Sequence, residues 1–198
     1  MNVRALIAVL AAIPLMVAAQ APAPKMPAPQ TWKNTAPETF HANGQITTKA
    51  GGAASALDIQ IERYTADADH EALVKALKEG PVPFLAALRK APQVGSMKLG
   101  PNVYPIRWAR QRPKDRDHRQ VAVVTDKPVF FAGAGAVDAK PTEGFDLALA
   151  EFTVDSVGIG TGRLAPAARV KAGGDTGIEI QDYSGSLITL VTVTRNSK

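Results

Sequence analysis

Residues 121–131 read VAVVTDKPVFF and form the most apolar and most β-branched stretch after the N-terminal leader. β-Branched side chains pack well on a pleated surface, so this run predicts a buried strand. The tetrapeptide at 125–128, TDKP, interrupts the run with residues that favour a turn. The densest basic segment of the chain leads directly into it. We therefore expect a sheet organised around this strand, with a basic surface beside it.

Short apolar or alternating runs flank this stretch and are separated by Gly, Pro, Asp and Ser, a pattern typical of antiparallel strands. In the run at 145–154, apolar residues occupy both parities, which predicts burial on both faces or a bulge near Ala150. The expected strands are 40–48, 56–64, 94–99, 103–112, 118–125, 145–154, 158–170, 177–183 and 187–195.

Two short amphipathic helices interrupt the strands. The segment 65–67, TAD, offers N-cap side chains to the first helix, and Gly80-Pro81 ends it. The second helix is expected over about 83–90. Such a pair needs a sheet to cover its apolar face. The predicted fold class is α+β, mainly β: an antiparallel β-barrel or strongly curved sandwich with an inserted two-helix hairpin that closes one end or edge.

The N-terminal segment predicts export. Residues 1–21 combine Arg4, an apolar run at 5–18 and small residues at the end, as a secretory signal peptide does. A transmembrane anchor is the alternative, but a spanning helix needs roughly 20 apolar residues. Residues 22–39 form a Pro/Ala-rich linker and 40–198 a single β-rich domain. We expect a periplasmic or secreted protein with no transmembrane segment after signal cleavage.

The composition narrows the functional classes. The chain has 198 residues, 45% of them hydrophobic, and a net charge of +5 that is spread over both halves. A nucleic-acid-binding protein usually concentrates its positive charge, so no nucleic-acid partner is expected. Cysteine is absent, which excludes disulfides, thiolate nucleophiles and Cys-type zinc sites. We expect no cofactor and no metal.

The basic segment supplies the first candidate binding site. In a strand, Trp108, Arg110 and Arg112 project to one face, which combines an indole with two guanidinium groups. Guanidinium groups bind carboxylates and phosphates with good geometry. The alternative is a solvated hairpin tip in which Arg and Asp side chains pair with each other and contribute little to stability.

Acidic residues supply the second candidate site. Asp126 and Glu151 lie on expected strands, and two converging carboxylates could perform acid/base chemistry on a glycoside. The parity of its strand places Glu151 inward, where a charge needs a partner, and Arg110 is the expected one. A carboxylate-dependent hydrolase is therefore an alternative function.

Histidines and glycines give no comparable signal. His41, His70 and His118 are not spaced as metal ligands or catalytic bases, and His70 is expected on a helix surface or half-buried. The glycines of 158–162, GIGTG, are not followed by a good helix, as a dinucleotide-binding loop requires. They are expected to be hairpin and loop residues.

Several segments resemble a group of exported bacterial proteins of similar length that carry no assigned activity. The resemblance covers roughly residues 41–198. It implies a shared, self-contained exported domain, and it transfers no functional residue. The segments are IERYT at 61–65, LVKALKEGP at 73–81, WAR at 108–110, TDKP at 125–128 and IEIQDYSGSLITLVTVT at 178–194.

The sequence thus predicts an exported soluble binding or interaction domain. Its partner would be a small anionic or amphipathic ligand, held in a cavity of the curved sheet or on the Trp108/Arg110 face, or an envelope protein. An envelope-structural protein is a further alternative. The candidate binding residues are Trp108, Arg110, Arg112, Asp126 and Glu151.

Overall fold

A computed structural model describes residues 36–48, 51–130 and 143–196. The expected signal peptide, most of the expected linker and Phe131 lie outside the described residues. Within the described residues the chain forms, in order, β1 (Glu38–Thr48), β2 (Gly51–Ile61), α1 (Asp67–Glu79), α2 (Pro81–Lys90), β3 (Gly95–Leu99), β4 (Asn102–Pro113), β5 (His118–Thr125), β6 (Leu147–Asp155), β7 (Ile159–Ala172), β8 (Ile178–Tyr183) and β9 (Ile188–Asn196).

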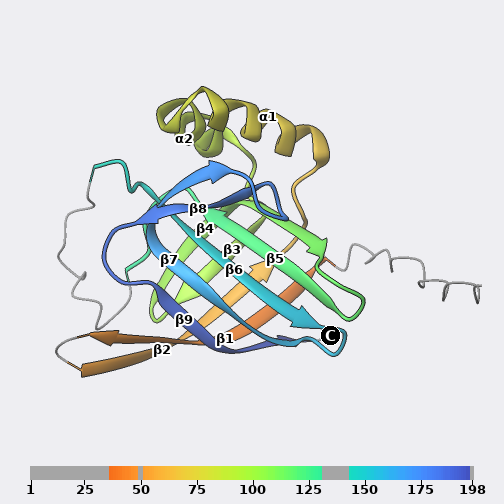
Figure 1. Cartoon of the computed structure of the whole chain (residues 1–198), viewed down its shortest axis with the longest axis vertical. Helices are drawn as coiled ribbons and strands as arrows, with labels where there is room; N and C mark the ends of the chain where they lie inside the picture. The colour runs from red at the N-terminus through yellow and green to blue at the C-terminus, as the bar shows by residue number, and fades with distance from the viewer. Residues whose placement is uncertain (1–35, 49–50, 131–142, 197–198) are drawn as a thin grey trace, which may run out of the picture.

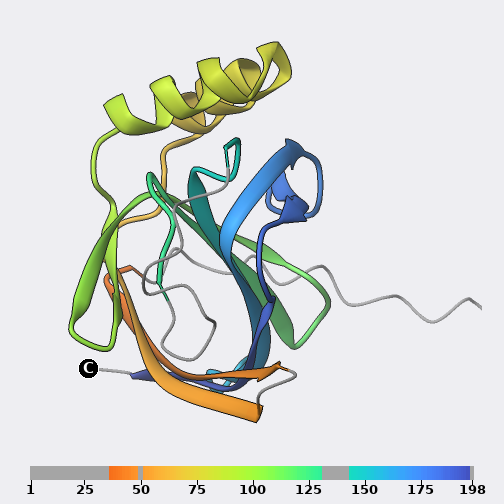
Figure 2. The same cartoon turned by 90° about the vertical axis from the view of Figure 1, so that its left-hand side faces the viewer.

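Eight of these strands close into an antiparallel barrel in the order β1, β2, β3, β4, β5, β6, β7, β9 and back to β1 (Figure 1). β8 pairs with the second half of β7 and continues the wall beyond the ring. The helices α1 and α2 connect β2 to β3 and lie across one end of the barrel (Figure 2). The expected fold class is confirmed. Of the two alternatives, an antiparallel barrel and a strongly curved sandwich, the structure has the closed barrel.

The middle of the wall formed by β4, β5 and β6 is buried on both of its faces. Val121 and Val123 of β5 point into the barrel, whereas Ala122 and Val124 face the helices. All of β5 from Val121 to Thr125 is buried, and β6 is buried on both faces, as its sequence predicted. Helix residues Leu73, Leu77, Phe84 and Leu88 cover the outer face. One wall therefore separates two apolar cores.

Large side chains fill the barrel interior. Phe40 and Phe152 meet edge to face, with ring centroids 4.8 Å apart. Ile59, Met97 and Ile106 pack in the same core and are fully buried. The interiors of eight-stranded barrels are often filled by side chains in this way.

Two local expectations were wrong. The N-cap residue of α1 is Ala66, which makes no side-chain capping bond. The Thr65 hydroxyl instead accepts a hydrogen bond from the Ala109 amide at 2.9 Å, because the loop before α1 pairs with β4. Gly158 lies in the turn before β7 as expected, but Gly160 and Gly162 lie within β7, in agreement with the expected strand 158–170 and not with a loop. A Cβ atom at either would overlap the backbone of β6, so close packing of β6 on β7 requires glycine there.

A buried polar cluster ties β1 to β5 inside the barrel. The Arg119 guanidinium donates to both carboxylate oxygens of Glu38, at 2.8 and 2.6 Å. Tyr64 donates to the same carboxylate, and Gln111 accepts from Arg119. Burial alone lowers the Arg119 pKa, but the hydrogen bonds and charges of Glu38 and Tyr64 outweigh it and raise this pKa. Burial and the charge of Glu38 raise the pKa of Tyr64.

Removing one partner of this cluster should be costly. Glu38→Ala leaves the Arg119 guanidinium buried without its carboxylate, and breaking a buried ion pair typically costs about 3–5 kcal/mol. We expect a loss of that size in the free energy of unfolding, measured by urea titration. Asp58→Ala is the matched control, because it removes a carboxylate from the half-exposed pair with His41 and should cost less than about 1 kcal/mol. Equal losses in the two variants would contradict this role for the cluster.

Candidate functional site: a cleft between the helices and the barrel

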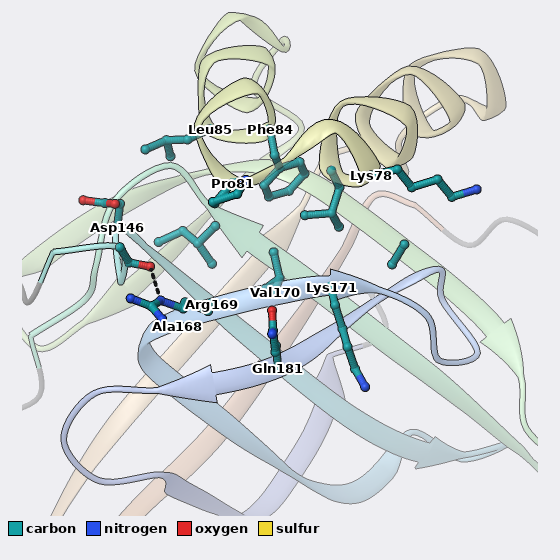
Figure 3. Close-up of a pocket in the computed structure, with 14 residues that line it drawn as sticks. Lys78, Pro81, Phe84, Leu85, Asp146, Ala168, Arg169, Val170, Lys171 and Gln181 are labelled. Atoms are coloured by element: carbon teal, nitrogen blue, oxygen red, sulfur yellow. Dashed lines mark hydrogen bonds between the residues drawn. The ribbon is translucent and has the colours of Figure 1, made fainter.

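A cleft of about 650 Å³ lies between the helix pair and the end of β7 (Figure 3). Its volume is within the range of sites that hold one small molecule. Most of its wall is apolar. Helices contribute Leu77, Pro81, Phe84 and Leu85, and strands contribute Leu147, Ala168, Val170 and Ala172.

The amphipathic character of the elements explains this wall. In β7, Ala168 and Val170 are buried and belong to the same apolar core as Leu77 and Phe84 of the helices. Arg169 and Lys171 alternate with them and are exposed, as the period of a strand requires. The helices do not cover this end of β7 completely, and the cleft is the space that remains beside it.

Two hydrogen bonds and an aromatic contact position the Arg169 side chain at the edge of the cleft. Its Nε atom donates to the Gly144 carbonyl at 3.2 Å, and Nη2 donates to the Glu143 carbonyl at 3.3 Å. The guanidinium carbon lies 4.4 Å from the centre of the Phe145 ring. Gly144 has φ +83°, and a Cβ atom there would lie 2.7 Å from Nη2. In the described part of the chain, the hydrogen bonds of Arg169 thus go to carbonyl oxygens and not to a carboxylate.

The other charged residues of the cleft differ from Arg169. Lys171 forms an ion pair with Glu179 at 3.1 Å, which neutralises it. Lys78 is an exposed residue of α1, and Figure 3 shows its amine pointing away from the apolar wall. Asp146 lines the same cleft and is partly exposed. Arg169 is therefore the fixed cation of this site.

Trp108 and Arg110, which were expected to share the face of a candidate binding site, lie beneath α1. The Trp108 indole is fully buried and donates to His70 Nδ1 at 3.1 Å. Arg110 is 7% exposed, and its Nη1 atom donates to Asp67 at 2.7 Å and to the Thr65 carbonyl at 3.1 Å. These residues hold the start of α1 against β4. Arg112, from the same face, is exposed.

The two candidate carboxylates are held in separate ion pairs. Asp126 accepts from Arg107 at 3.0 Å, and Glu151 accepts from Arg163 at 2.8 Å. In the sheet, Glu151 of β6 lies opposite Ala122 of β5. Asp126, directly after β5, is four residues further along the chain than Ala122, which corresponds to roughly 13 Å. Glu151 also lines a second, outer cleft from which Asp126 is absent. The geometry required for the hydrolase alternative is therefore not met by this pair.

The expected orientation and partner of Glu151 were wrong. Its neighbours Ala150 and Phe152 point into the barrel, so Glu151 points outward, although it is only 6% exposed. Ala122 of β5 lies between Arg110 of β4 and Glu151 of β6 in the sheet. Arg110 and Glu151 are therefore two strands apart, a distance of roughly 10 Å in total. Arg163 is nearer because β7 lies directly beside β6.

The histidines are structural in the described residues. His70 accepts from Trp108 as stated, His41 pairs with Asp58, and His118 pairs with Asp115 in a turn. Residues 36–48, 51–130 and 143–196 contain no group of three or more potential metal ligands. Neither helix in these ranges combines the length and apolar character of a membrane span.

The sequence interpretation missed the cleft residues. The alternation of Ala168, Val170 and Ala172 with two cations was visible and predicts one apolar and one basic face. The sequence carries no signal that this apolar face meets α2, or that Phe145 and Gly144 fix Arg169.

Comparison with known proteins adds no function, because no protein family, no curated protein and no solved structure matches the chain. The resemblance to exported bacterial proteins stays a prediction.

The contact of His70 with Trp108 predicts a pH dependence of stability. Burial of the imidazole, followed by the charges of Arg110 and Arg112, lowers the His70 pKa against the opposing effect of Asp67 and Glu71. The unfolded chain therefore binds this proton more readily. The free energy of unfolding should be highest above about pH 6.5 and should fall as the pH drops below that value toward the folded-state pKa.

Urea titrations across this range test the expectation. His70→Gln keeps a hydrogen-bond acceptor but does not titrate, so its loss of stability between neutral and mildly acidic pH should be smaller than that of the wild type. His118→Gln removes an imidazole from an exposed turn far from this contact and is the control variant. If His70→Gln loses as much stability as the wild type, His70 is not the group responsible.

Proposed function

We propose that this protein is an exported binding domain that takes a small amphipathic anion into the cleft between the helices and β7. The single observation that carries the proposal is the position of Arg169 beside an apolar wall, with hydrogen bonds that, among the described residues, go to carbonyl oxygens and to no carboxylate. Small-molecule sites typically combine such walls with a few well-placed polar groups. Export is the part of the proposal that rests on residues 1–21.

Two features favour this cleft over the sites that were expected from the sequence. The barrel interior is occupied by Phe40, Phe152 and their neighbours, so it offers little space. The Trp108 indole is buried and Arg110 is engaged by Asp67, so both side chains act in packing. The helix–barrel cleft is both open to solvent and apolar.

The exposed apolar residues give no comparable support to an envelope-structural role. In the described residues, the large exposed ones are Val82, Val103, Val157, Ile159 and Tyr183. They lie on α2, β4, β7 with the turn before it, and β8. Surface apolar residues that occur singly are ordinary, whereas an interaction surface is usually contiguous.

A fluorescent amphipathic anion, anilinonaphthalene sulfonate, provides the test. We expect saturable binding at one site per chain. Arg169→Met should weaken this binding by about 10-fold or more, because a hydrogen-bonded charge contributes about 1.5–3 kcal/mol. Leu85→Gln, which changes a half-buried wall residue, should also weaken it. Urea titration of each variant verifies that the fold is retained.

Arg116→Met is the matched control. It removes one positive charge from an exposed turn outside the cleft, so the affinity should stay within about twofold of the wild type, as for a charge screened by solvent. If Arg116→Met and Arg169→Met weaken binding equally, the probe senses net charge and the proposed site is wrong. If binding of the probe to the wild type does not saturate, the proposed site is also wrong.

A further inference from the structure

We infer that the ligand of this cleft is a single-chain alkyl carboxylate whose carboxylate binds the free edge of Arg169 and whose chain lies along the wall formed by β7 and the helices. This inference rests on the proposed function and names the chemical class of the ligand.

The geometry of Arg169 selects the head group. A guanidinium has five N–H donors, and Nε and one hydrogen of Nη2 are used by the Gly144 and Glu143 carbonyls. No other acceptor for Arg169 lies within the described residues, so the edge formed by Nη1 and Nη2 keeps two parallel donors there. This is the fork that binds both oxygens of a carboxylate. The Phe145 ring centre lies 4.4 Å from the guanidinium carbon. An anion binds the guanidinium in its plane, because its N–H donors point outward in that plane.

The surrounding charges favour a head group with one negative charge. Lys171 is neutralised by Glu179, and the carboxylate of Asp146 lines the same cleft. A doubly charged phosphate would meet one fixed cation and the repulsion of Asp146. A carboxylate needs only the charge that Arg169 supplies, so alkyl carboxylates should bind better than alkyl phosphates of equal length.

The wall selects the tail. One side of the cleft is formed by the small apolar side chains of β7, which are Ala168, Val170 and Ala172. The opposite side is formed by larger apolar side chains of the helices, which are Leu77, Phe84 and Leu85. Figure 3 shows this wall extending from the Arg169 end of the cleft toward α1. A cleft of about 650 Å³ has room for one chain of this kind, whereas a two-chain lipid exceeds the usual size of such a site.

Calorimetric titration with hexanoate, octanoate, decanoate and dodecanoate tests the inference on the intact protein. Each buried methylene contributes about 0.8 kcal/mol, so the affinity should rise about fourfold per added methylene until the chain outgrows the wall. Decanol should bind more weakly than decanoate by about 10-fold or more. Decyl phosphate should not bind more tightly than decanoate.

Variants separate the two halves of the ligand. Arg169→Met should remove the preference for decanoate over decanol and leave the dependence on chain length unchanged. Arg169→Lys keeps the charge without the fork and should restore only part of the preference. Leu85→Gln should reduce the gain per methylene and keep the preference for the carboxylate. Arg116→Met should change neither quantity.

Each contrary result would contradict either the ligand class or the proposed function. If affinity does not depend on chain length, or if decyl phosphate binds more tightly, the alkyl carboxylate assignment is wrong. The proposed function survives that result as long as anilinonaphthalene sulfonate still binds in an Arg169-dependent manner. If neither the probe nor any alkyl carboxylate binds, both the ligand class and the proposed function fail.

Discussion

The fold depends on one wall that is buried on both faces. In β5, the side chains of Val121 and Val123 pack inside the barrel while those of Ala122 and Val124 pack under the helices. A strand with no solvent-facing side must be apolar at nearly every position, which is why this stretch stands out in the sequence. Because the same strands serve both cores, the helix layer and the barrel share one boundary, and the helix–barrel cleft lies at its edge.

Closure of the barrel imposes a second constraint. β7 must lie against β6 on one side and β9 on the other, and Gly160 and Gly162 permit this approach. The Glu38–Arg119 pair then links the first strand to β5 across the interior. With Phe40 and Phe152 beside it, the interior is filled. The cleft lined by Arg169 lies outside the barrel, where helices meet strands.

Arginine residues divide into structural and available ones. Arg110 and Arg163 are paired with Asp67 and Glu151, and Arg119 is enclosed in the interior. Arg169 is exposed and is held by two carbonyl oxygens and a ring, and among the described residues its hydrogen bonds go to no carboxylate. A cation that is positioned without being neutralised can bind an anion at little cost in side-chain entropy. The distinction depends on what each guanidinium contacts.

The sequence by itself determined the elements and their class. Alternation and turn residues placed both helices and eight of the nine strands within about two residues of their observed bounds, because these signals are local. β2 is the exception: it begins five residues before the expected strand 56–64 and ends three residues before its end. Only the tertiary structure decided between barrel and sandwich, turned Glu151 outward to Arg163, and buried Trp108 beneath α1. It also brought Arg169 and Phe145 to the wall formed by α2. These outcomes depend on strand order and helix docking, which join residues far apart in the chain and leave no periodic signal in the sequence.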